Sequence, residues 1–515
     1  MTASPDVPTA TLHLEVRHGG YQDSVRLMQV GQAIGGVPGV SHALVAMATV
    51  LNLELAAQMG FRPPTDVTAN DLLVAIASND EESLRQALAR LELELAPPAA
   101  PAVGAAVTTV PPRTVGSAIR RTGATLAVVS TPGEHAFVEA MDAVQAGASV
   151  MVFSDNVPVW QEIRLKDTAA AQGVLVMGPD CGTAVLGGVG IGFANVVRPG
   201  PVGLVAASGT GAQQVMCLLD AAGVGISHCL GVGGRDLSTE IAGRSTLAAL
   251  DALDADPATE LIVLVSKPPA AEVADVVRAH AAELGTPVVV ALLGSGQPDL
   301  TAAVTRVLGR IGRPVPGHWP AWLPAVPPAT VPPAAGAALR GLFAGGTLAD
   351  EAMLIASAAL GPIRSNIPLR PEWALPRDAD PLADGPLADG HWMVDFGADE
   401  LTRGRPHPMI DNTLRLRRLA QEAADPAGGT VLLDVVLGHA ADPDPAAVLA
   451  PAIAAAVAGG LAVVVSLTGT DNDPQDLNRQ AGALRAAGAA VFRSNADAAR
   501  HAVALVRAGA SEGTR

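Results

Sequence analysis

Residues 200–238 constrain the fold more than any other part of the chain. An apolar run at 202–207 has the length and composition of a buried strand. It ends in a turn of small residues, after which apolar side chains recur at helical spacing from Ala212 to Leu219. A second apolar run, at 224–230, ends at a glycine-rich turn. The stretch therefore predicts strand, turn, helix, strand and turn, the pattern of a parallel α/β sheet.

The first of these turns is a predicted anion site. A helix that opens on Ser-Gly-Thr-Gly has free backbone N–H groups and the positive end of its dipole in its first turn. Both features favour a bound anion, phosphate above all. We therefore expect phosphate contacts from Ser208, Gly209, Thr210 and Gly211.

Two further turns are candidates for the same chemistry. Gly233 and Gly234 precede Arg235, which either pairs with a carboxylate or phosphate or is simply a surface cation. Farther along, a helical segment opens on Gly345, Gly346 and Thr347, a weaker glycine signal for a second phosphate cradle.

Alternating strands and helices run through most of the chain. Residues 117–199 and 200–315 show the rhythm of βαβ units and predict parallel sheets with helices on both faces, and residues 336–515 predict another α/β domain. In such sheets, ligands bind at the carboxyl ends of strands. Residues 1–96 mix strand and helix patterns and predict a ferredoxin-like α+β module. Two segments rich in Pro and Ala, 97–116 and 316–335, are predicted linkers.

The composition narrows the class of protein. The formal net charge of −17 argues against nucleic acid and anionic membranes as partners, but leaves small anionic substrates open. Only three cysteines occur, and none forms a CxxC pair. The N-terminus lacks a signal-peptide pattern, and the most apolar segments are too short to span a bilayer. We expect a cytoplasmic protein.

Residues 403–412, RGRPHPMIDN, form a dense polar loop stiffened by two prolines. We predict that Arg405, His407 and Asp411 are catalytic. The alternative is a loop that merely crosses the surface, where polar residues are normal.

Other reactive side chains have a structural interpretation. His439 follows a strand and is expected to be a structural histidine rather than an acid or base. Cys181 has no neighbouring base in the sequence and is expected to be a packed residue. The histidines lack metal-ligand spacing, so no metal site is predicted.

Residues 125–300 resemble the α-subunit of succinyl-CoA ligase. The matching pieces are VPVWQEIRLKDTAAAQGVLVMGPDCGT, the SGTGAQ turn and GVGGRDLS. Residues 340–480 resemble a ligase domain of the same superfamily. With YQDS, MATVLN, GRPHPMIDN and LLDVVLGHAADPDPA added, nearly the whole chain is similar to the FdrA family. The resemblance implies an α/β protein with a CoA-binding-type Rossmann domain and two flavodoxin-like ligase domains after the N-terminal module.

In succinyl-CoA ligases, the helix after the Ser-Gly-Thr turn points its N-terminus at a phosphohistidine, so the resemblance implies phosphate contacts at 208–211. This chain departs from that pattern twice. After the strand matched by residues 288–293 it has Gly294-Ser295-Gly296 and no histidine. No glycine-rich loop precedes Leu126, where the ligase's CoA domain opens. These departures count against both phosphohistidine transfer and CoA binding.

The FdrA resemblance implies a component of an oxamate carbamoyltransferase in allantoin catabolism, acting with partner subunits. Its substrates would be phosphate or carbamoyl phosphate and an oxamate-like acceptor. Carbamoyl transfer needs a seat for phosphate and stabilisation of an oxyanion, but no covalent nucleophile. The helix N-termini at 208–211 and 345–347 could supply these jointly. The alternatives are a CoA ligase of the ADP- or GDP-forming acyl-CoA synthetase type and a non-catalytic regulatory subunit.

Overall fold

The computed structural model describes residues 11–512 except 21, 23, 65, 97–110, 326–337, 378, 384, 386, 404 and 426–428. The chain divides into two compact units. The first comprises residues 1–112 and a short segment, Thr402–Pro406. The second comprises Arg113–Leu401 and His407–Arg515.

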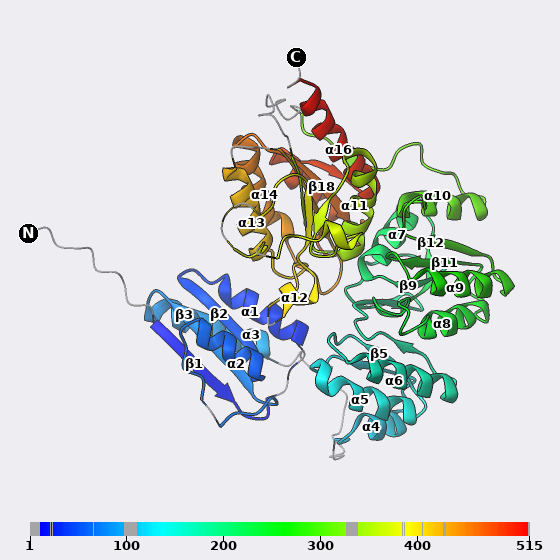
Figure 1. The fold of residues 1–515 in the computed structure, drawn as a ribbon. Coiled ribbons are helices and arrows are strands. Elements are labelled where there is room, and N and C mark those ends of the chain that lie inside the picture. Colours follow the sequence, from blue (N-terminus) through cyan, green and yellow to red (C-terminus); the bar gives the residue numbers. More distant parts are fainter. Residues whose placement is uncertain are drawn as a thin grey trace, which may run out of the picture. The chain divides into compact units, whose positions relative to one another are not determined.

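The first unit contains a three-stranded antiparallel sheet in the order β1-β3-β2 (Figure 1). The elements are β1 (Thr11–Arg17), α1 (Ser24–Gly35), β2 (Val40–Met47), α2 (Val50–Gln58), β3 (Leu72–Ser78) and α3 (Glu81–Leu95). The central strand β3 pairs with both neighbours in antiparallel register. A split β-α-β arrangement with a strand between its two halves is the ferredoxin-like pattern, as the sequence predicts.

The buried strand β3 explains why this unit folds. Every residue of its sequence LLVAIAS is buried. Leu72, Val74 and Ile76 pack against α1 and α3, while Leu73 and Ala75 belong to a second core on the opposite face. Helix α3 opens on Asp80, whose side chain accepts a hydrogen bond from the backbone of Ser83, the cap that the sequence suggests.

The second unit begins with a small parallel sheet in the order β4-β5-β6. Its elements are α4 (Val115–Thr122), β4 (Leu126–Val129), α5 (Gly133–Gln145), β5 (Ser149–Val152), α6 (Val159–Gln172) and β6 (Val176–Met177). The sheet has three strands, half the number in a full dinucleotide-binding fold. The α/β pattern predicted for 117–199 is therefore present in a short form.

A six-stranded sheet follows, in the order β12-β11-β9-β10-β7-β8. Its elements are β7 (Thr183–Leu186), β8 (Val189–Gly192), β9 (Pro199–Ala207), α7 (Gly209–Ala221), β10 (Ile226–Gly231), α8 (Arg244–Asp254), β11 (Leu261–Ser266), α9 (Ala271–Glu283), β12 (Val288–Leu292) and α10 (Leu300–Arg310). Helices α8 and α9 pack against one face. We call residues 199–310 the first ligase-like domain.

The last sheet has seven strands, in the order β13-β19-β18-β17-β14-β16-β15. Its elements are β13 (Ala321–Trp322), β14 (Ala338–Phe343), α11 (Gly346–Leu360), β15 (Arg364–Ser365), η1 (Pro371–Trp373), β16 (Trp392–Asp395), α12 (Asp399–Thr402), α13 (Thr413–Ala424), β17 (Gly429–Val436), α14 (Pro445–Ala458), β18 (Ala462–Thr468), α15 (Leu477–Ala486), β19 (Ala490–Phe492) and α16 (Asn495–Glu512). Helices α13, α14 and α15 cover one face, and α11 packs beside α16 (Figure 1). We call residues 338–512 the second ligase-like domain.

Several elements differ from the sequence-based expectation. Strand β13 lies inside the predicted linker 316–335 and pairs antiparallel with β19. Helix α4 begins at Val115, inside the other predicted linker, of which residues 97–110 lie outside the described part. The β7–β8 hairpin and helix α16 were not expected. The strands were missed because two to four residues are too few to show a periodicity.

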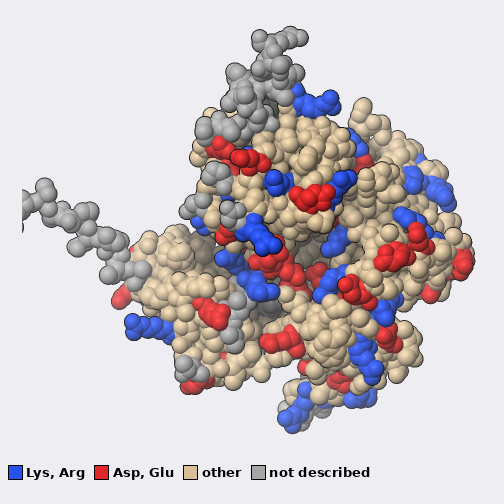
Figure 2. Space-filling model, viewed as in Figure 1, with Lys and Arg blue, Asp and Glu red and all other residues tan. Residues whose placement is uncertain are grey.

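Among the described residues, no helix combines the length and apolar character needed to cross a bilayer. Acidic and basic side chains are interspersed over the face shown in Figure 2.

Candidate functional site

Both ligase-like sheets have a topological switch point. In the first, strand order reverses between β9 and β11, which pair in parallel. In the second, it reverses between β14 and β17. Ligands of open α/β sheets bind at such points, beyond the carboxyl ends of the strands. Helix α7 follows β9, and helix α11 follows β14, so each switch point carries a helix N-terminus.

The two helix N-termini meet. The Ser208 hydroxyl donates a hydrogen bond of 2.7 Å to the Thr347 hydroxyl and accepts one of 2.9 Å from the backbone of Gly211. The Gly345 backbone also packs against the Thr210 side chain, because a Cβ added to Gly345 would lie 2.6 Å from the Thr210 Oγ1. The turns at 208–211 and 345–347, predicted separately, therefore form one locus, which we call the paired-helix site.

A buried carboxylate fixes the backbone immediately before helix α11. The Asp434 carboxylate accepts hydrogen bonds from the backbone of Ala344 (2.7 Å) and Gly345 (2.9 Å). Arg415 donates to Asp434 at 2.9 Å, which neutralises a carboxylate that has no access to water. The start of α11 is thus fixed before any ligand arrives.

Two more carboxyl groups lie at this end of α11. The Asp395 Oδ1 accepts from the backbone of Gly397 at 2.9 Å, and its Oδ2 lies 2.7 Å from where a Cβ of Gly346 would be. Burial raises the pKa of Asp395 to about 7, with Asp434 and Asp350 adding to the effect and Lys267 opposing it. Burial likewise raises the pKa of Asp350, the fifth residue of α11, to about 7. Carboxyls with such pKa values can give or take a proton near neutral pH.

Lys267 is a basic residue whose positive charge acts on these carboxyl groups. It follows β11 at the first switch point and is exposed. Its ammonium lowers the pKa of Asp180, Asp350 and Asp395, against the larger effect of burial. The Lys267 Nζ and an Asp180 carboxylate oxygen lie 3.5 and 3.1 Å from the position of a Cβ on Gly234. No ion pair of Lys267 occurs among the described residues under a 4 Å limit.

His407 lies beside Asp395. Its Nδ1 accepts a hydrogen bond of 3.2 Å from the backbone N–H of Met409, and its ring lies 5.7 Å from that of Phe193. Its Nε2 and the Asp395 Oδ1 lie 2.8 and 3.1 Å from where a Cβ of Gly397 would be. Burial and the Arg415 guanidinium lower the pKa of His407 to about 4, so the ring is neutral at pH 7.

The other predicted residues have different surroundings. Arg235 donates 2.8 Å hydrogen bonds to the Glu162 carboxylate and to the Val157 carbonyl, so the structure gives this cation an internal partner. Gly233, at φ +91°, packs against Pro179. Both residues join the short parallel sheet to the first ligase-like domain.

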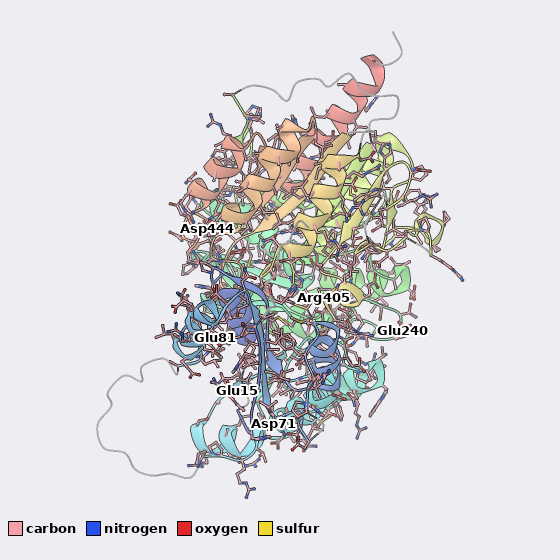
Figure 3. The ribbon with its side chains drawn as sticks, turned by 90° about the vertical axis from the view of Figure 1, so that its left-hand side faces the viewer. Glu15, Asp71, Glu81, Glu240, Arg405 and Asp444 are labelled. Atoms are coloured by element: carbon pink, nitrogen blue, oxygen red, sulfur yellow. The ribbon has the colours of Figure 1, made fainter. Side chains whose placement is uncertain are left out.

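Asp411 and Arg405 have other surroundings. Asp411 accepts 2.7 and 2.5 Å hydrogen bonds from the backbone and side chain of Thr413, the first residue of α13. Arg405, labelled in Figure 3, falls in the segment that groups with the first unit and is not assigned to the site. Of the three predicted catalytic residues, the structure brings only His407 to it.

Cys181 and His439 differ in their surroundings. Cys181 is buried, and burial raises the pKa of its thiol to about 12, so it is not a ready nucleophile. The backbone N–H of His439 donates to the Ala194 carbonyl at 2.8 Å, and its side chain is exposed.

Sequence reasoning missed Lys267, Asp350 and Asp395. One signal was available for Lys267. The chain has 33 basic residues, but only two are lysines, Lys166 and Lys267. Lysine and arginine are not interchangeable where a compact charge is needed. Asp350 is hidden inside a helix, and no spacing rule distinguishes it from a surface acid.

A buried polar network locks the two ligase-like domains together. The Asn195 amide donates to the Leu437 carbonyl at 2.8 Å and to Asp473 at 2.7 Å. The Thr468 hydroxyl donates to Gln214 at 2.9 Å, and Gln214 donates to the Arg493 carbonyl at 2.9 Å. Because these groups are buried and paired, the contact between α7 and α11 is preorganised.

The comparisons with known proteins agree with this architecture. Residues 10–109 match the family model described as AllF, heavy metal-associated domain, and residues 342–505 match the CoA-ligase family. The protein YahF of Escherichia coli, described as uncharacterized, is 36% identical over 517 residues, covering 94% of this chain and 96% of YahF. The chain belongs to the YahF family. This chain thus combines an N-terminal domain of the AllF type with CoA-ligase-like domains.

Relatives of known activity match a smaller part. The α-subunit 2 of an ADP-forming succinate–CoA ligase from Archaeoglobus fulgidus is 30% identical over 157 residues, covering 30% of this chain and 53% of the subunit. The α-subunit of malate–CoA ligase from Methylorubrum extorquens is 28% identical over 162 residues, covering 30% of this chain and 53% of that subunit. This chain thus spans about half the length of these subunits. The fold is CoA-ligase-like.

Among solved structures, a dinucleotide-forming acetyl-coenzyme A synthetase 1 from Ca. Korarchaeum cryptofilum, in complex with phosphate and ADP, aligns with 15% identity. It covers 76% of this chain and 84% of its own, with a TM-score of 0.28. A TM-score this low does not by itself establish a shared fold.

The residues of the N-terminal domain do not fit a heavy metal. Residues 10–109 contain no cysteine, the ligand that soft metals prefer. In the described part of the chain, no three His, Cys, Asp or Glu side chains are grouped to hold a metal ion. Asp71, for example, accepts hydrogen bonds from Gly19 and Thr68, which lower its pKa to about 2 (Figure 3).

Proposed function

We propose that the protein catalyses acyl transfer between phosphate and a small acceptor, with phosphate seated at the paired-helix site. The observation that supports this most directly is the contact between Ser208 and Thr347, which joins the N-termini of α7 and α11. Two helix dipoles that converge on one point favour an anion more than either does alone. Lys267 adds a compact positive charge at the same switch point.

The acyl group that we propose is carbamoyl, supported by the resemblance to the FdrA family. In this reaction a phosphate oxygen attacks the carbamoyl carbon of oxalurate, and the bond from that carbon to the oxamate nitrogen breaks. The attacking HPO₄²⁻ loses one proton and the leaving nitrogen gains one, so the products are carbamoyl phosphate and oxamate. Asp395, with its pKa near 7, is placed to pass this proton.

A second candidate is supported by the CoA-ligase match at residues 342–505. In that reaction CoA would be the acyl acceptor. The loop after β12 has Gly294, Ser295 and Gly296 at the place where the related ligases carry a phosphorylated histidine, so this chain would have to form acyl phosphate directly.

We also propose that the protein acts with partner subunits, which the resemblance to the FdrA family implies.

The assay follows carbamoyl phosphate by ³¹P NMR, with oxalurate and phosphate as substrates. It is run on the purified chain, with and without the products of neighbouring genes, and CoA binding is measured by calorimetry in parallel. Carbamoyl phosphate formation without CoA binding would support the first reaction. CoA binding with no carbamoyl phosphate would support the second. The absence of both carbamoyl phosphate and CoA binding would refute acyl transfer.

Phosphate binding at the paired-helix site is tested with Gly345→Ala. A Cβ there would meet the Thr210 side chain at 2.6–2.8 Å and push the two helix starts apart. We expect phosphate affinity, measured by calorimetry, to fall by about tenfold or more. The matched control is Gly482→Ala in helix α15, where a Cβ has no neighbour within 4 Å. The double variant Thr210→Gly/Gly345→Ala, which removes the clash, should regain affinity. Unchanged binding in Gly345→Ala would remove the site assignment.

A further inference from the structure

We infer that the second unit contains a binding pocket for a small organic cation, one that carries an ammonium or guanidinium group on an apolar body. The pocket is lined by residues from three segments, 365–366, 374–382 and 400–401. None of them belongs to the paired-helix site, and the inference does not depend on the proposed acyl transfer.

The pocket offers room for a ligand. Its volume is about 420 Å³, within the range of about 300 to 1,000 Å³ that is typical of small-molecule sites. Strand β15 lies at the edge of the seven-stranded sheet and pairs in parallel with β16. Because Ser365 ends β15, the pocket lies beyond the carboxyl end of a strand, where open α/β sheets bind ligands.

The apolar walls of the pocket are fixed by the core of the second ligase-like domain. Leu401 is buried in that core, and Leu375, Ala379 and Leu382 pack against it. The backbone N–H of Leu375 also donates to the Ser365 carbonyl at 3.0 Å, which ties the loop after β15 back to the strand. The chain's own contacts thus shape the cavity before a ligand binds, which lowers the free-energy cost of binding.

Asn366 fixes the polar side of the pocket. Its amide oxygen accepts a hydrogen bond of 3.0 Å from the backbone N–H of Asp395, and its amide nitrogen donates to the Asp395 carbonyl at 2.9 Å. The same nitrogen donates a longer hydrogen bond, of 3.4 Å, to the Glu400 Oε1. Asn366 therefore holds Glu400 at the pocket and connects the pocket to the end of β16.

Two carboxylates of the pocket, Glu400 and Asp380, have unused hydrogen-bonding capacity. One oxygen of each is occupied, because the Glu400 Oε1 accepts from Asn366 and the Asp380 Oδ1 accepts from the backbone of Leu382 at 2.8 Å. The Glu400 Oε2 and the Asp380 Oδ2 accept no hydrogen bond from the described residues. Both side chains are exposed, so a bound cation can reach them.

The arginines of this region do not neutralise these carboxylates. Arg364 donates to the Ala374 carbonyl at 3.5 Å, and Arg370 lies over the Trp373 ring, 4.8 Å from its centroid. Arg377 is exposed and, like the other two, forms no ion pair with an acid in the described part of the chain. Apolar walls beside two negative charges without a cationic partner favour a cation with an apolar body and disfavour an anion.

Leucine methyl signals locate the ligand. The full chain is labelled with ¹³C at its leucine methyl groups, and the signals of Leu375, Leu382 and Leu401 are assigned by their loss in Leu375→Met, Leu382→Met and Leu401→Met, a swap that protein cores tolerate. The probe is hexylammonium. We expect it to shift these three signals in a titration that saturates. Shifts confined to other leucines would overturn the inference.

Three analogues of the probe test the chemical class of the ligand. Hexanoate has the same length and the opposite charge and should leave the three signals unshifted. Hexanol has no charge and should bind about three- to tenfold more weakly. Ethylammonium has the charge but a shorter apolar body and should bind at least about tenfold more weakly. Hexanol that bound as tightly as hexylammonium would show an apolar groove with no preference for cations and would overturn the inference.

A lysine side chain of a partner protein has the same chemistry as an alkylammonium ion. The blocked peptide acetyl-Gly-Lys-Gly-amide tests this source of the cation. We expect it to bind more weakly than hexylammonium, because the volume of the pocket is that of a small-molecule site. Tighter binding of the peptide would assign the pocket to a partner protein and overturn the assignment to a small molecule.

Two substitutions test the carboxylates. Glu400→Gln and Asp380→Asn remove the charges but keep an oxygen acceptor for Asn366 and for Leu382. We expect each to raise the Kd of hexylammonium about threefold, and the double variant to raise it about tenfold, because exposed charge pairs contribute modestly. The matched control is Glu372→Gln, which removes an exposed carboxylate from η1 in the same loop but does not line the pocket. An unchanged Kd in the double variant would overturn the inference. An equal rise in Glu372→Gln would also overturn it, since the probe would then respond to the acidic surface as a whole.

Discussion

Asp395 sits where three influences compete. Burial and the neighbouring Asp434 and Asp350 disfavour its charge, whereas the Gly397 N–H and Lys267 favour it. The outcome is a carboxyl that is half-protonated near pH 7, which a transfer step requires of its proton carrier. The raised pKa of Asp395 also lowers the stability of the folded chain at high pH.

The stability effect of Asp395 has a definite sign. Its pKa is about 7 in the folded chain and about 3.9 in an unfolded one. The protonated form is favoured by folding, so its contribution is complete below pH 4 and is lost as the pH rises through 7. We expect Asp395→Asn, which keeps an acceptor for Gly397, to be more stable than wild type at pH 8 by about 1 to 4 kcal/mol.

Urea unfolding at pH 5 and pH 8 measures this difference. The gain of Asp395→Asn should shrink at pH 5. A gain that is equal at both pH values would show that the substitution acts through packing and not through the carboxyl's charge.

Lys267 is the cation that we propose for the paired-helix site. Among the described residues, no carboxylate lies within 4 Å of it, although it lowers the pKa of three of them. We expect Lys267→Met to weaken phosphate binding by about tenfold, because one charge–phosphate contact is worth at least 1.4 kcal/mol in a partly buried site. Calorimetry with inorganic phosphate measures the loss. Lys267→Arg should recover part of the affinity; an equal loss in both variants would mean that position 267 acts through shape.

At the scale of elements, the packing of α6 against the turn after β10 joins the short parallel sheet to the first ligase-like domain. Lys166 donates to Glu162 at 2.8 Å and to Asp236 at 2.6 Å, and all three side chains are buried. Arg235 reaches the same Glu162 with a side chain that is 41% exposed. The same acid thus has a buried partner and a partly exposed one.

These two partners differ in energetic weight. We expect Lys166→Met to lower the free energy of unfolding by about 3 to 5 kcal/mol, because it leaves the buried Asp236 carboxylate without a cation and Glu162 with Arg235 alone. Arg235→Gln should cost about 1 kcal/mol or less, as solvent screens the exposed pair. Urea unfolding of both variants at pH 7 makes the comparison. Similar losses of unfolding free energy in the two variants would contradict the conclusion that Lys166, Glu162 and Asp236 contribute most to this contact.

The elements also show what the sequence could and could not predict. Of the turns at 208–211 and 345–347, the first follows a continuous apolar run, so its strand, turn and helix were legible from the sequence. The second follows β14, whose sequence ALRGLF contains Arg340 and Gly341 and carries no such run, so a helix was expected there. Their meeting through Ser208 and Thr347 was not legible from the sequence, because it depends on how two sheets pack and on the close approach that Gly345 permits. The loop at 403–412 contributes His407, which lies beside Asp395, but its predicted catalytic role stays a prediction. The same loop contains Asp411, whose hydrogen bond to the backbone of Thr413 could not be told from a catalytic role by residue type.

At the scale of the whole molecule, the chain joins two units with different tasks. The first has a core around β3 and lacks the cysteines of a metal carrier. The second contains both switch points, and the network around Asn195 and Asp473 makes its two ligase-like domains one folding unit. Ligand binding should therefore stabilise one part of the chain and leave the other unchanged.

Calorimetric unfolding of the full chain tests this division. We expect two transitions, because each unit has its own core, and phosphate should raise the midpoint of only the one that reports the second unit. At a phosphate concentration 100 times its Kd, binding adds about 2.7 kcal/mol to the stability of the unit that holds it. Lys267→Met should reduce that shift without changing the transition of the first unit. If phosphate shifted both transitions equally, the anion would be acting on the chain as a whole, and the paired-helix site would lose its claim to be the place where phosphate binds.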